Sequence, residues 1–191
     1  MKLVIIDYGA GNVFSVKSAF ERLGINVSIS ADKHEISSAD RVVFPGVGHA
    51  GAAMDKLRHS ELDNLIPQLK QPVLGVCLGM QLMCESTEEG NEEGLGIFEG
   101  VKVKRFAHGL NIPHMGWNNL KEGKGFLENI NEDVYFVHSY YAPVSPFTIA
   151  SCHYGILFSA ALQKNNFYAC QFHPEKSGTV GEEILKRFLK A

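Results

Sequence analysis

The sequence has no long hydrophobic run and no excess of basic residues. No stretch approaches the roughly 18–20 apolar residues that a membrane-spanning helix needs. The apolar part of Met1–Asp7 is too short, and too soon followed by an acid, for a signal peptide. Lys and Arg number 18 against 21 Asp and Glu, a formal net charge of −3, whereas nucleic-acid and membrane-surface binding need a basic footprint. We therefore expect a cytoplasmic protein with neither nucleic acid nor membrane among its partners.

Patterns for binding metals and phosphates are also missing. The four cysteines, Cys77, Cys84, Cys152 and Cys170, form no C-x-x-C pair and no zinc-type spacing. The glycines of Asp7–Asn12 depart from the dinucleotide-binding fingerprint, because Phe14 stands where its last glycine is required. We expect no metal and no cofactor. In a reducing compartment each cysteine is then a small core residue or a reactive thiol.

The overall composition, 45% hydrophobic and 20% charged, is typical of a globular domain. No repeat or linker interrupts it, so we expect one domain over residues 1–191. The first half alternates apolar runs with helical patterns, which predicts a parallel sheet covered on both faces. Predicted strands are Lys2–Ile6, Ile25–Ile29, Arg41–Phe44 and Pro72–Cys77; predicted helices are Asn12–Leu23, Ala50–Leu69 with breaks near Ser60 and Pro67, and Leu78–Ser86.

After Gly94 the pattern changes to short β-rich segments separated by turns, and an amphipathic helix at Thr179–Leu189 closes the chain. The predicted fold is therefore α/β and three-layered. It has a mixed, mainly parallel central sheet, flanking helices and added antiparallel strands. The β-rich segments are Gly96–Phe106, His114–Leu120, Val134–Ser139, Phe147–His153, Ile156–Gln163 and Phe167–Phe172.

The pentapeptide Gly75–Gly79 has the G-x-nucleophile-x-G pattern of a nucleophile elbow, with Cys77 at its centre. A sharp turn from strand to helix crowds the backbone, and glycines on both sides relieve the crowding. At a helix N-terminus the macrodipole favours a thiolate, and the N–H of Leu78 is placed to hold an oxyanion. On this pattern alone, a core cysteine between two packing glycines is an equally good interpretation.

A nucleophilic cysteine needs a base, because a free thiol of pKa about 8.5 is only a few per cent ionised at neutral pH. His173 and Glu175 can supply it. If the strand Phe167–Phe172 runs on through His173, residues two apart project to the same side. The carboxylate would then take one imidazole N–H and leave the other ring nitrogen for the thiol. The alternative, a solvated His and Glu, loses weight because both motifs end predicted strands, where open α/β sheets place their sites.

The segment Pro45–Gly48 directly follows another predicted strand. Its glycines allow the backbone to turn the N–H of Val47 or Gly48 toward a developing negative charge. An ordinary tight turn is the alternative interpretation.

Together these motifs resemble those of the class I, or triad-type, glutamine amidotransferases. Within that family the sequence is similar to the glutaminase subunits of imidazole glycerol phosphate synthases. The resemblance extends over nearly the whole chain. Its motifs are Ile6–Asn12, Pro45–Gly48, Gly75–Gln81, Pro113–Asn118 and Gln171–Ser177.

The resemblance implies that Cys77 attacks the side-chain amide of L-glutamine, forming a glutamyl thioester and releasing ammonia. His173 would transfer the proton and Glu175 would orient it. The N–H groups of Leu78 and of Val47 or Gly48 would form the oxyanion hole. The residues implied to hold the α-amino and α-carboxylate end of glutamine are Gln81, Glu89, His138, Ser139 and Tyr140.

The resemblance also implies a partner, a (β/α)8-barrel synthase subunit. It would receive the ammonia and make imidazole glycerol phosphate and an aminoimidazole carboxamide ribotide in histidine biosynthesis. The implied docking residues are Asn12, Met115, Trp117 and Asn118. An exposed tryptophan is a usual interface anchor, but composition alone favours a core position for Trp117 almost as strongly.

One segment departs from the family pattern. His49–Ala52 follows Gly48 where relatives carry other residues, and we expect His49 to be a solvated residue at a helix start. Two other classes of protein remain as alternatives. One is a different cysteine-nucleophile α/β protein, such as a peptidase or a DJ-1-like protein, which lacks a late His-Pro-Glu. The other is a non-catalytic flavodoxin-like binding module, in which Cys77 would be inert.

Overall fold

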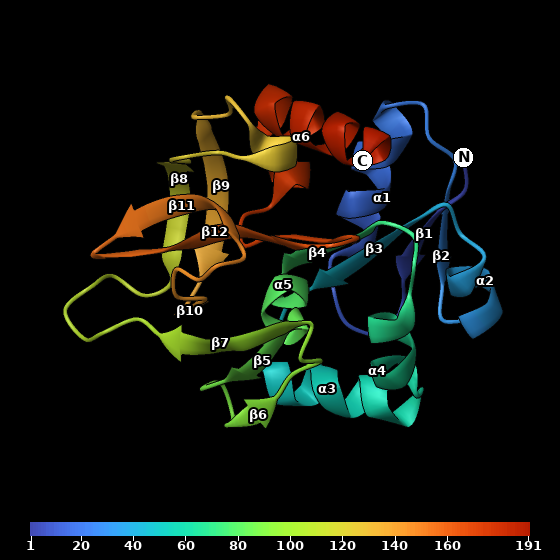
Figure 1. The fold of residues 1–191 in the computed structure, drawn as a ribbon, viewed down its shortest axis with the longest axis horizontal. Helices are drawn as coiled ribbons and strands as arrows, with labels where there is room; N and C mark the ends of the chain where they lie inside the picture. Colours follow the sequence, from blue (N-terminus) through green and yellow to red (C-terminus); the bar gives the residue numbers. More distant parts are fainter.

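A seven-stranded mixed sheet forms the centre of the protein in a computed structural model that describes residues 1–191 (Figure 1). The strand order is β11–β12–β13–β4–β3–β1–β2. From β13 to β2 the strands are parallel, whereas β11 and β12 add an antiparallel edge. The strands are β1 (Leu3–Ile6), β2 (Val27–Ser30), β3 (Arg41–Gly46), β4 (Val73–Cys77), β11 (Thr148–Tyr154), β12 (Ile156–Lys164) and β13 (Phe167–Cys170).

Helices cover both faces of this sheet. Figure 1 shows α1 (Val13–Arg22) and α6 (Gly178–Lys190) on one face, and α3 (Ala50–His59) and α4 (Leu62–Leu65) on the other. All four residues of β1 are fully buried, as parallel sheets covered on both faces require. Leu3 and Ile5 belong to the core on the α1 and α6 side, whereas Val4 and Ile6 belong to the core on the α3 side. The remaining helices are α2 (Lys33–Ser37) and α5 (Leu78–Met83).

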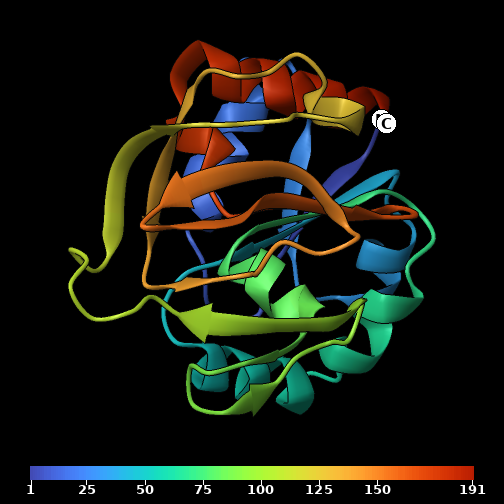
Figure 2. The same cartoon turned by 60° about the vertical axis from the view of Figure 1, so that its left-hand side comes forward.

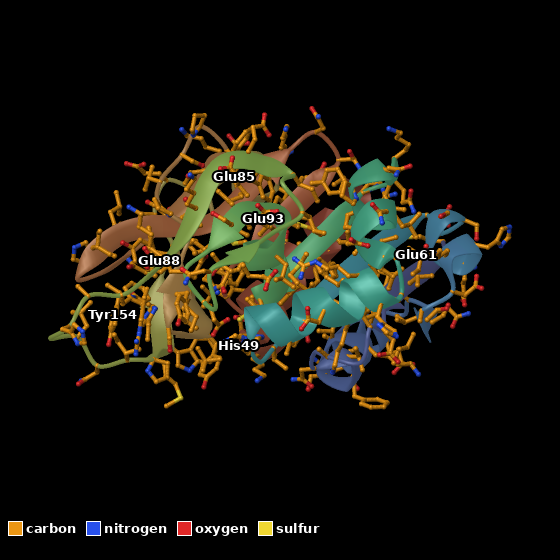
Figure 3. The ribbon with its side chains drawn as sticks, turned by 90° about the horizontal axis from the view of Figure 1, so that it is seen from below. His49, Glu61, Glu85, Glu88, Glu93 and Tyr154 are labelled. Carbon is orange, nitrogen blue, oxygen red and sulfur yellow. The ribbon has the colours of Figure 1, made fainter.

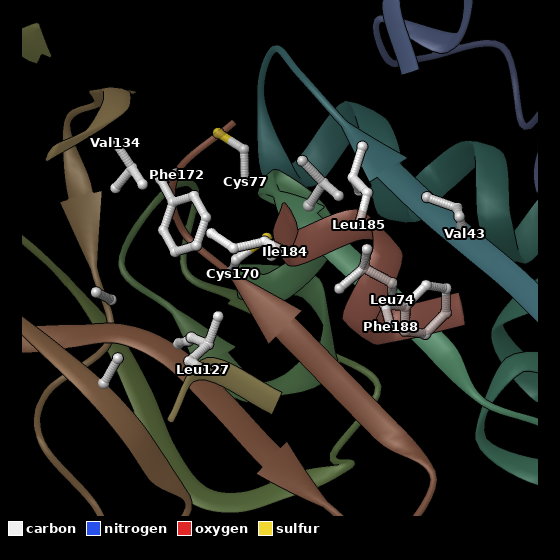
Figure 4. Close-up of a cluster of buried hydrophobic side chains, with 14 of the residues drawn as sticks. Val43, Leu74, Cys77, Leu127, Val134, Cys170, Phe172, Ile184, Leu185 and Phe188 are labelled. Atoms are coloured by element: carbon white, nitrogen blue, oxygen red, sulfur yellow. The ribbon is translucent and has the colours of Figure 1, made fainter. Parts of the chain in front are cut away.

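The core beneath α6 reaches the carboxyl end of β4. Ile184, Leu185 and Phe188 of α6 are buried in one cluster with Val43, Leu74 and Cys77 of the sheet (Figure 4). Full burial of each large apolar side chain contributes about 1.5–3 kcal/mol. The backbone that carries Cys77 is thus anchored in a packed core.

Two smaller sheets flank the central one. β7 (Phe98–Arg105) pairs with β5 (Cys84–Thr87) and β10 (Tyr140–Tyr141), and β6 (Glu92–Glu93) completes this four-stranded sheet. β8 (His114–Asn119) and β9 (Asp133–His138) form a separate antiparallel pair. In Figure 2 the β11–β12 hairpin lies between α6 and the four-stranded sheet.

The four-stranded sheet packs beside α3. Figure 3 labels Glu85, Glu88 and Glu93 in the region of this sheet and His49 at the end of α3. An ion pair between Arg58 and Glu92 joins α3 to β6. The three short 3₁₀ segments are η1 (Ile66–Gln68), η2 (Gly125–Leu127) and η3 (Pro174–Lys176).

The predicted fold class is confirmed, and most predicted strands and helices lie within a few residues of their observed bounds. The predicted helix Leu78–Ser86 is wrong at its end, since α5 stops at Met83 and Cys84 begins β5. Short apolar runs fit a buried strand and a buried helix equally well, and here pairing with β7 selects the strand. The four-stranded sheet and α2 were not predicted. No helix has the length and apolar character needed to cross a membrane.

Candidate active site

Cys77 lies at a strained turn between β4 and α5. Its φ of 54° and ψ of −109° fall in a region that residues with a side chain rarely adopt, at a cost of about 1–3 kcal/mol. The two glycines around it leave no room for a Cβ. One added to Gly79 would lie 2.0 Å from the carbonyl oxygen of Phe44, and one added to Gly75 would lie 2.8 Å from Sδ of Met83. The turn is therefore close-packed as well as strained.

His173 and Glu175 form a buried pair just beyond β13. His173 Nδ1 and Glu175 Oε1 are 2.8 Å apart, and the two side chains are 2% and 1% exposed. Our prediction of the local geometry was wrong, because β13 ends at Cys170 and Glu175 lies in η3 rather than on a continued strand. His173 is extended, and the 3₁₀ turn that starts at Pro174 carries the carboxylate back to the ring. A hydrogen bond from the N–H of His173 to the carbonyl of Tyr135, 2.9 Å long, fixes the backbone.

Electrostatics at this pair favours the imidazolium. Burial alone disfavours a charged His173, but the interactions with Cys77 and Glu175 outweigh it and raise the pKa of His173 to about 10. The carboxylate occupies Nδ1, and the buried Nε2 makes no hydrogen bond within the protein. That nitrogen is therefore free to give or take a proton on the side of the ring away from Glu175.

The other three cysteines lie in the core with no exposed surface. Burial raises the pKa of Cys84 and Cys170, and it raises the pKa of Cys152 to about 12. These thiols stay protonated at neutral pH. Cys77, by contrast, lines a cavity.

The cavity in front of Cys77 has a volume of about 180 Å³. Pockets for drug-sized ligands span about 300–1,000 Å³, so this one suits a single small metabolite. The structure here brings together residues from five separate stretches of sequence: Val47, Gly48, Cys77, Leu78, Gln81, Glu89, His138, Ser139 and Tyr140. Each of them was predicted from the sequence as a nucleophile, oxyanion or substrate residue.

The end of β3, which leads into Val47 and Gly48, packs directly on the elbow. A Cβ added to Gly46 would lie 2.6 Å from the backbone nitrogen of Gly79, and Gly48 has a φ of 102°, which favours glycine. The hydroxyl of Tyr8, which follows β1, donates a 2.9 Å hydrogen bond to the carbonyl of Pro45. Burial, aided by Cys77, raises the pKa of Tyr8, so this hydroxyl remains a donor at neutral pH. Tyr8 thus ties the loop after β1 to the last residues of β3, directly before Val47 and Gly48.

Much of the rest of the cavity lining is polar. Gln81 Nε2 donates to the carbonyl of Tyr140 at 3.0 Å and to Oε1 of Gln171 at 2.9 Å. Oε2 of Glu89 accepts a 2.8 Å hydrogen bond from the N–H of Ala50, the first residue of α3. Both N–H groups of Gln81 are thus used within the protein, which leaves its carbonyl oxygen for a ligand.

The predicted docking residues do not all face the same way. On β8, Met115 and Trp117 are 65% and 56% exposed, so the core interpretation of Trp117 is wrong. Asn118 is half-buried and its amide faces inward, 3.3 Å from Nε2 of His114 and 3.1 Å from the carbonyl of His153. Asn12 is half-buried and precedes α1.

His49 begins α3. It is exposed, and its Nδ1 accepts a hydrogen bond from the N–H of Gly51 at 3.2 Å. Figure 3 places it at the end of this helix, beside the four-stranded sheet. Its role in the structure is that of a helix cap, as expected.

Sequence reasoning missed three side chains around the site: Tyr8, His114 and Gln171. Gln171 could have been found, because it lies in the same motif as His173, near the end of the predicted strand that leads to the base. Tyr8 and His114 carry no such signal, since the loops and the small sheets that bring them close were not predicted.

A strained cysteine at the carboxyl end of a parallel strand, beside a buried His–Glu pair, defines the class of α/β proteins with a cysteine at a nucleophile elbow. Comparison with known proteins makes the assignment specific. The chain matches the family Glutamine amidotransferase class-I over residues 4–191, and it belongs to this family. It is therefore an enzyme of the glutamine amidotransferase type.

The similarity extends over full chains. The chain is 54% identical over 198 residues to "Imidazole glycerol phosphate synthase subunit HisH" of Bacteroides fragilis, and 48% identical over 195 residues to the subunit of that name from Escherichia coli, with 100% of each chain covered in both cases. A crystal structure described as a glutamine amidotransferase superposes with a TM-score of 0.78 at 19% identity, covering 98% of this chain and 97% of that one. Membership of this family excludes a peptidase, a DJ-1-like protein and a flavodoxin-like binding module.

Proposed function

We propose that this chain is the glutaminase subunit of an imidazole glycerol phosphate synthase. Cys77, His173 and Glu175 would hydrolyse L-glutamine, and the ammonia would pass to a synthase subunit. The observation that carries the proposal is the buried His173–Glu175 pair beside a strained cysteine that lines a small polar cavity. Full-length identity of 48–54% to relatives named as this subunit supports the specific assignment.

The first half-reaction forms a thioester. The Cys77 sulfur attacks the side-chain carbonyl carbon of glutamine, and the tetrahedral oxyanion is held by the N–H of Leu78 and that of Val47 or Gly48. His173, charged through its interactions with Cys77 and Glu175, gives its Nε2 proton to the departing nitrogen. The C–N bond breaks, ammonia leaves, and a glutamyl thioester and a neutral imidazole remain.

The second half-reaction hydrolyses that thioester. Nε2 of the neutral His173 takes a proton from water, and the oxygen attacks the thioester carbon. The C–S bond breaks, glutamate leaves, and the sulfur and the imidazolium are restored. Throughout, Glu175 holds Nδ1 and keeps Nε2 directed at the reacting atoms.

The polar wall of the cavity suits the amino-acid end of glutamine. The free carbonyl oxygen of Gln81 and the carboxylate of Glu89 are acceptors, which an α-ammonium group requires. We propose that the segment His138–Tyr140 binds the same end of the substrate from the opposite side of the cavity.

The partner in this proposal is a (β/α)8-barrel synthase subunit. Exposed Met115 and Trp117 on β8 provide the large apolar side chains that anchor protein interfaces. Phe14 at the start of α1 is 74% exposed and extends this apolar set. Ammonia is mostly protonated in neutral water and then cannot act as a nucleophile, so direct transfer to a docked partner has a chemical rationale.

The test is Cys77→Ala, assayed in complex with the synthase subunit and with either glutamine or an ammonium salt as nitrogen source. We expect glutamine-dependent synthesis to fall by at least about 10⁴-fold, because the nucleophile is lost, while ammonium-dependent synthesis continues. Cys152→Ala, which removes a thiol buried far from the chemistry, is the matched control and should retain both activities. Glutamine turnover by the Cys77→Ala complex would overturn the proposal.

A further inference from the structure

The side-chain amide of Gln171 lies at the active site but takes no part in the mechanism above. Gln171 follows β13, is fully buried, and has its backbone N–H bonded to the carbonyl of Ala160 at 2.8 Å. Its Nε2 lies 3.7 Å from Sγ of Cys77. The amide is thus in contact with the nucleophilic sulfur from the buried side of the cavity.

The direction of this contact follows from the hydrogen bonds behind it. The carbonyl of Tyr140 can only accept, so the Gln81 atom 3.0 Å from it is the NH₂ group. The same NH₂ group lies 2.9 Å from Gln171, whose facing atom must therefore be the carbonyl oxygen. The NH₂ group of Gln171 is then left to face the sulfur. The oxygen and nitrogen of a side-chain amide cannot be told apart from their positions alone. Here the series of hydrogen bonds that ends on the carbonyl of Tyr140 fixes the orientation of both amides.

A pair of buried histidines holds that backbone carbonyl in place. His138 Nδ1 lies 2.7 Å from the same oxygen of Tyr140 and must donate to it. Its Nε2 then accepts from Nδ1 of His114 at 3.0 Å, and Nε2 of His114 accepts from the amide of Asn118 at 3.3 Å. Burial lowers the pKa of His138 to about 3 and that of His114 to about 4, so both rings are neutral at physiological pH, as these tautomers require.

We propose that Gln171 is a further catalytic residue, whose side-chain N–H stabilises the thiolate form of Cys77. A thiolate is a stronger acceptor than a thiol, so an N–H aimed at the sulfur favours the charged form. Gln81, His138 and His114 act through Gln171 as positioning residues. This inference rests on Cys77 being the nucleophile of the proposed function.

Several other groups influence the same sulfur, and the test must hold them constant. They come from each element packed around Cys77: Tyr8 after β1, Cys170 at the end of β13, His173 and Glu175 beyond it, and Glu89 and His138 across the cavity. Substitutions at Gln171 alter none of these side chains.

The experiment measures the rate of iodoacetamide alkylation at Cys77 from pH 5 to pH 10, quantified on the Cys77 peptide by mass spectrometry. Gln171→Glu keeps the acceptor for Gln81 and replaces the N–H donor by a carboxylate oxygen. We expect alkylation at pH 7 at least about tenfold slower than in the parent chain, because a hydrogen bond to a charged group, about 1.5–3 kcal/mol, is lost. The added carboxylate also repels a thiolate, so the uncharged Gln171→Asn variant isolates the loss of the N–H. The midpoint of the pH profile should shift to higher pH.

Gln68→Glu, the same change on the exposed surface, is the matched control and should leave the profile unchanged. Gln171→Asn keeps the polar amide and withdraws it by one methylene. It should fold where the Glu variant does not, and it should show a smaller shift in the same direction. A profile unchanged in the folded Gln171→Asn variant would overturn the inference, even if Gln171→Glu shifts it.

Alkylation requires neither glutamine nor a partner, so the two proposals fail separately. A chain that shows the expected shift but hydrolyses no glutamine in complex with the synthase would contradict the proposed function alone. A chain that hydrolyses glutamine with an unshifted profile would contradict the role of Gln171 alone.

Discussion

Two regions of the molecule differ in how they carry function. The elbow region, where β3, β4 and β13 end, is buried, strained and close-packed, and it adjoins the buried His173–Glu175 pair. The β8–β9 pair places two large apolar side chains, Met115 and Trp117, in solvent while its inward residues pack in the core. Buried strain and paired charges are what chemistry at a sulfur requires, whereas exposed apolar surface is what association requires.

Because the two regions differ in this way, we expect substitutions at the elbow region to change the glutaminase rate or the stability of the fold. Substitutions on the outward face of β8 should instead change partner affinity. Tyr8 follows β1 and donates a hydrogen bond to Pro45 at the end of β3, so it belongs to the elbow region.

The largest effect expected is on catalysis, from Glu175→Gln. The amide keeps the shape of the carboxylate but no longer fixes the imidazole tautomer or its charge, a change that costs about 10⁴-fold in a comparable triad. We expect the glutaminase rate of the complex to fall by about 10²–10⁴-fold. Glu183→Gln, the same change on the exposed side of α6, should leave the rate unaltered. Equal rates for the two variants would exclude Glu175 from the triad.

The same substitution should change the pH dependence of stability. The pKa of His173 is raised from its ordinary 6.5 to about 10, so its protonation stabilises the fold fully below pH 6.5. That contribution declines as pH rises through the window from 6.5 to 10 and is absent above it. Urea unfolding should show a smaller loss of stability across this window in Glu175→Gln than in the parent chain, and identical slopes would contradict the assigned pair.

The next effect is on folding, from Gly79→Ala. The added Cβ would lie 2.0 Å from the carbonyl oxygen of Phe44, a fully buried residue of the central strand β3 that cannot yield. We expect a loss of about 3 kcal/mol or more in the free energy of unfolding. Gly24→Ala, where nothing lies within 4 Å of the added Cβ, isolates the cost of positive φ alone and should lose only about 1 kcal/mol. Equal losses would show that the elbow is not close-packed.

A smaller effect, confined to association, is expected from Trp117→Ala. Truncating an aromatic anchor costs about 2 kcal/mol of binding free energy, which is about 30-fold in Kd. Titration calorimetry with the synthase subunit should show this weakening, while unfolding of the isolated chain is unchanged. Unaltered affinity would show that β8 is not part of the docking surface, and it would contradict the functional difference between the two regions.

The smallest effect is expected from Tyr8→Phe, which removes one hydroxyl and leaves the buried carbonyl of Pro45 without its donor. An orphaned buried acceptor costs about 1–3 kcal/mol. We expect a several-fold fall in kcat of the complex with KM for glutamine little changed, because the loop carrying Val47 and Gly48 loses its tether. A change in KM alone would assign Tyr8 to substrate binding instead.

Prediction from the sequence succeeded where local physics determines structure. The elbow glycines, the break near Ser60 and the strands of the parallel sheet follow from backbone crowding and apolar periodicity within a few residues. It failed at Cys84, because pairing with β7 determines that this residue begins a strand. It also failed at Glu175, because a 3₁₀ turn, which has no signature in the apolar periodicity, places the carboxylate.

The substrate-binding residues were predicted from the resemblance to a family and not from hydrophobic periodicity. Nothing in the local pattern of Glu89 or Tyr140 indicates that the two line one cavity with Cys77, yet they do. Long-range packing of small sheets on the central one brings them there, and such packing has no short sequence signature.

The most direct test of the central claim uses an electrophilic analogue of glutamine that carries a chloroketone in place of the side-chain amide. The complex is incubated with the analogue and digested, and the modified residue is identified by mass spectrometry. The account predicts one adduct, on Cys77, formed much more slowly in His173→Ala. An adduct on Cys84, Cys152 or Cys170, or labelling of Cys77 at the same rate without His173, would contradict it.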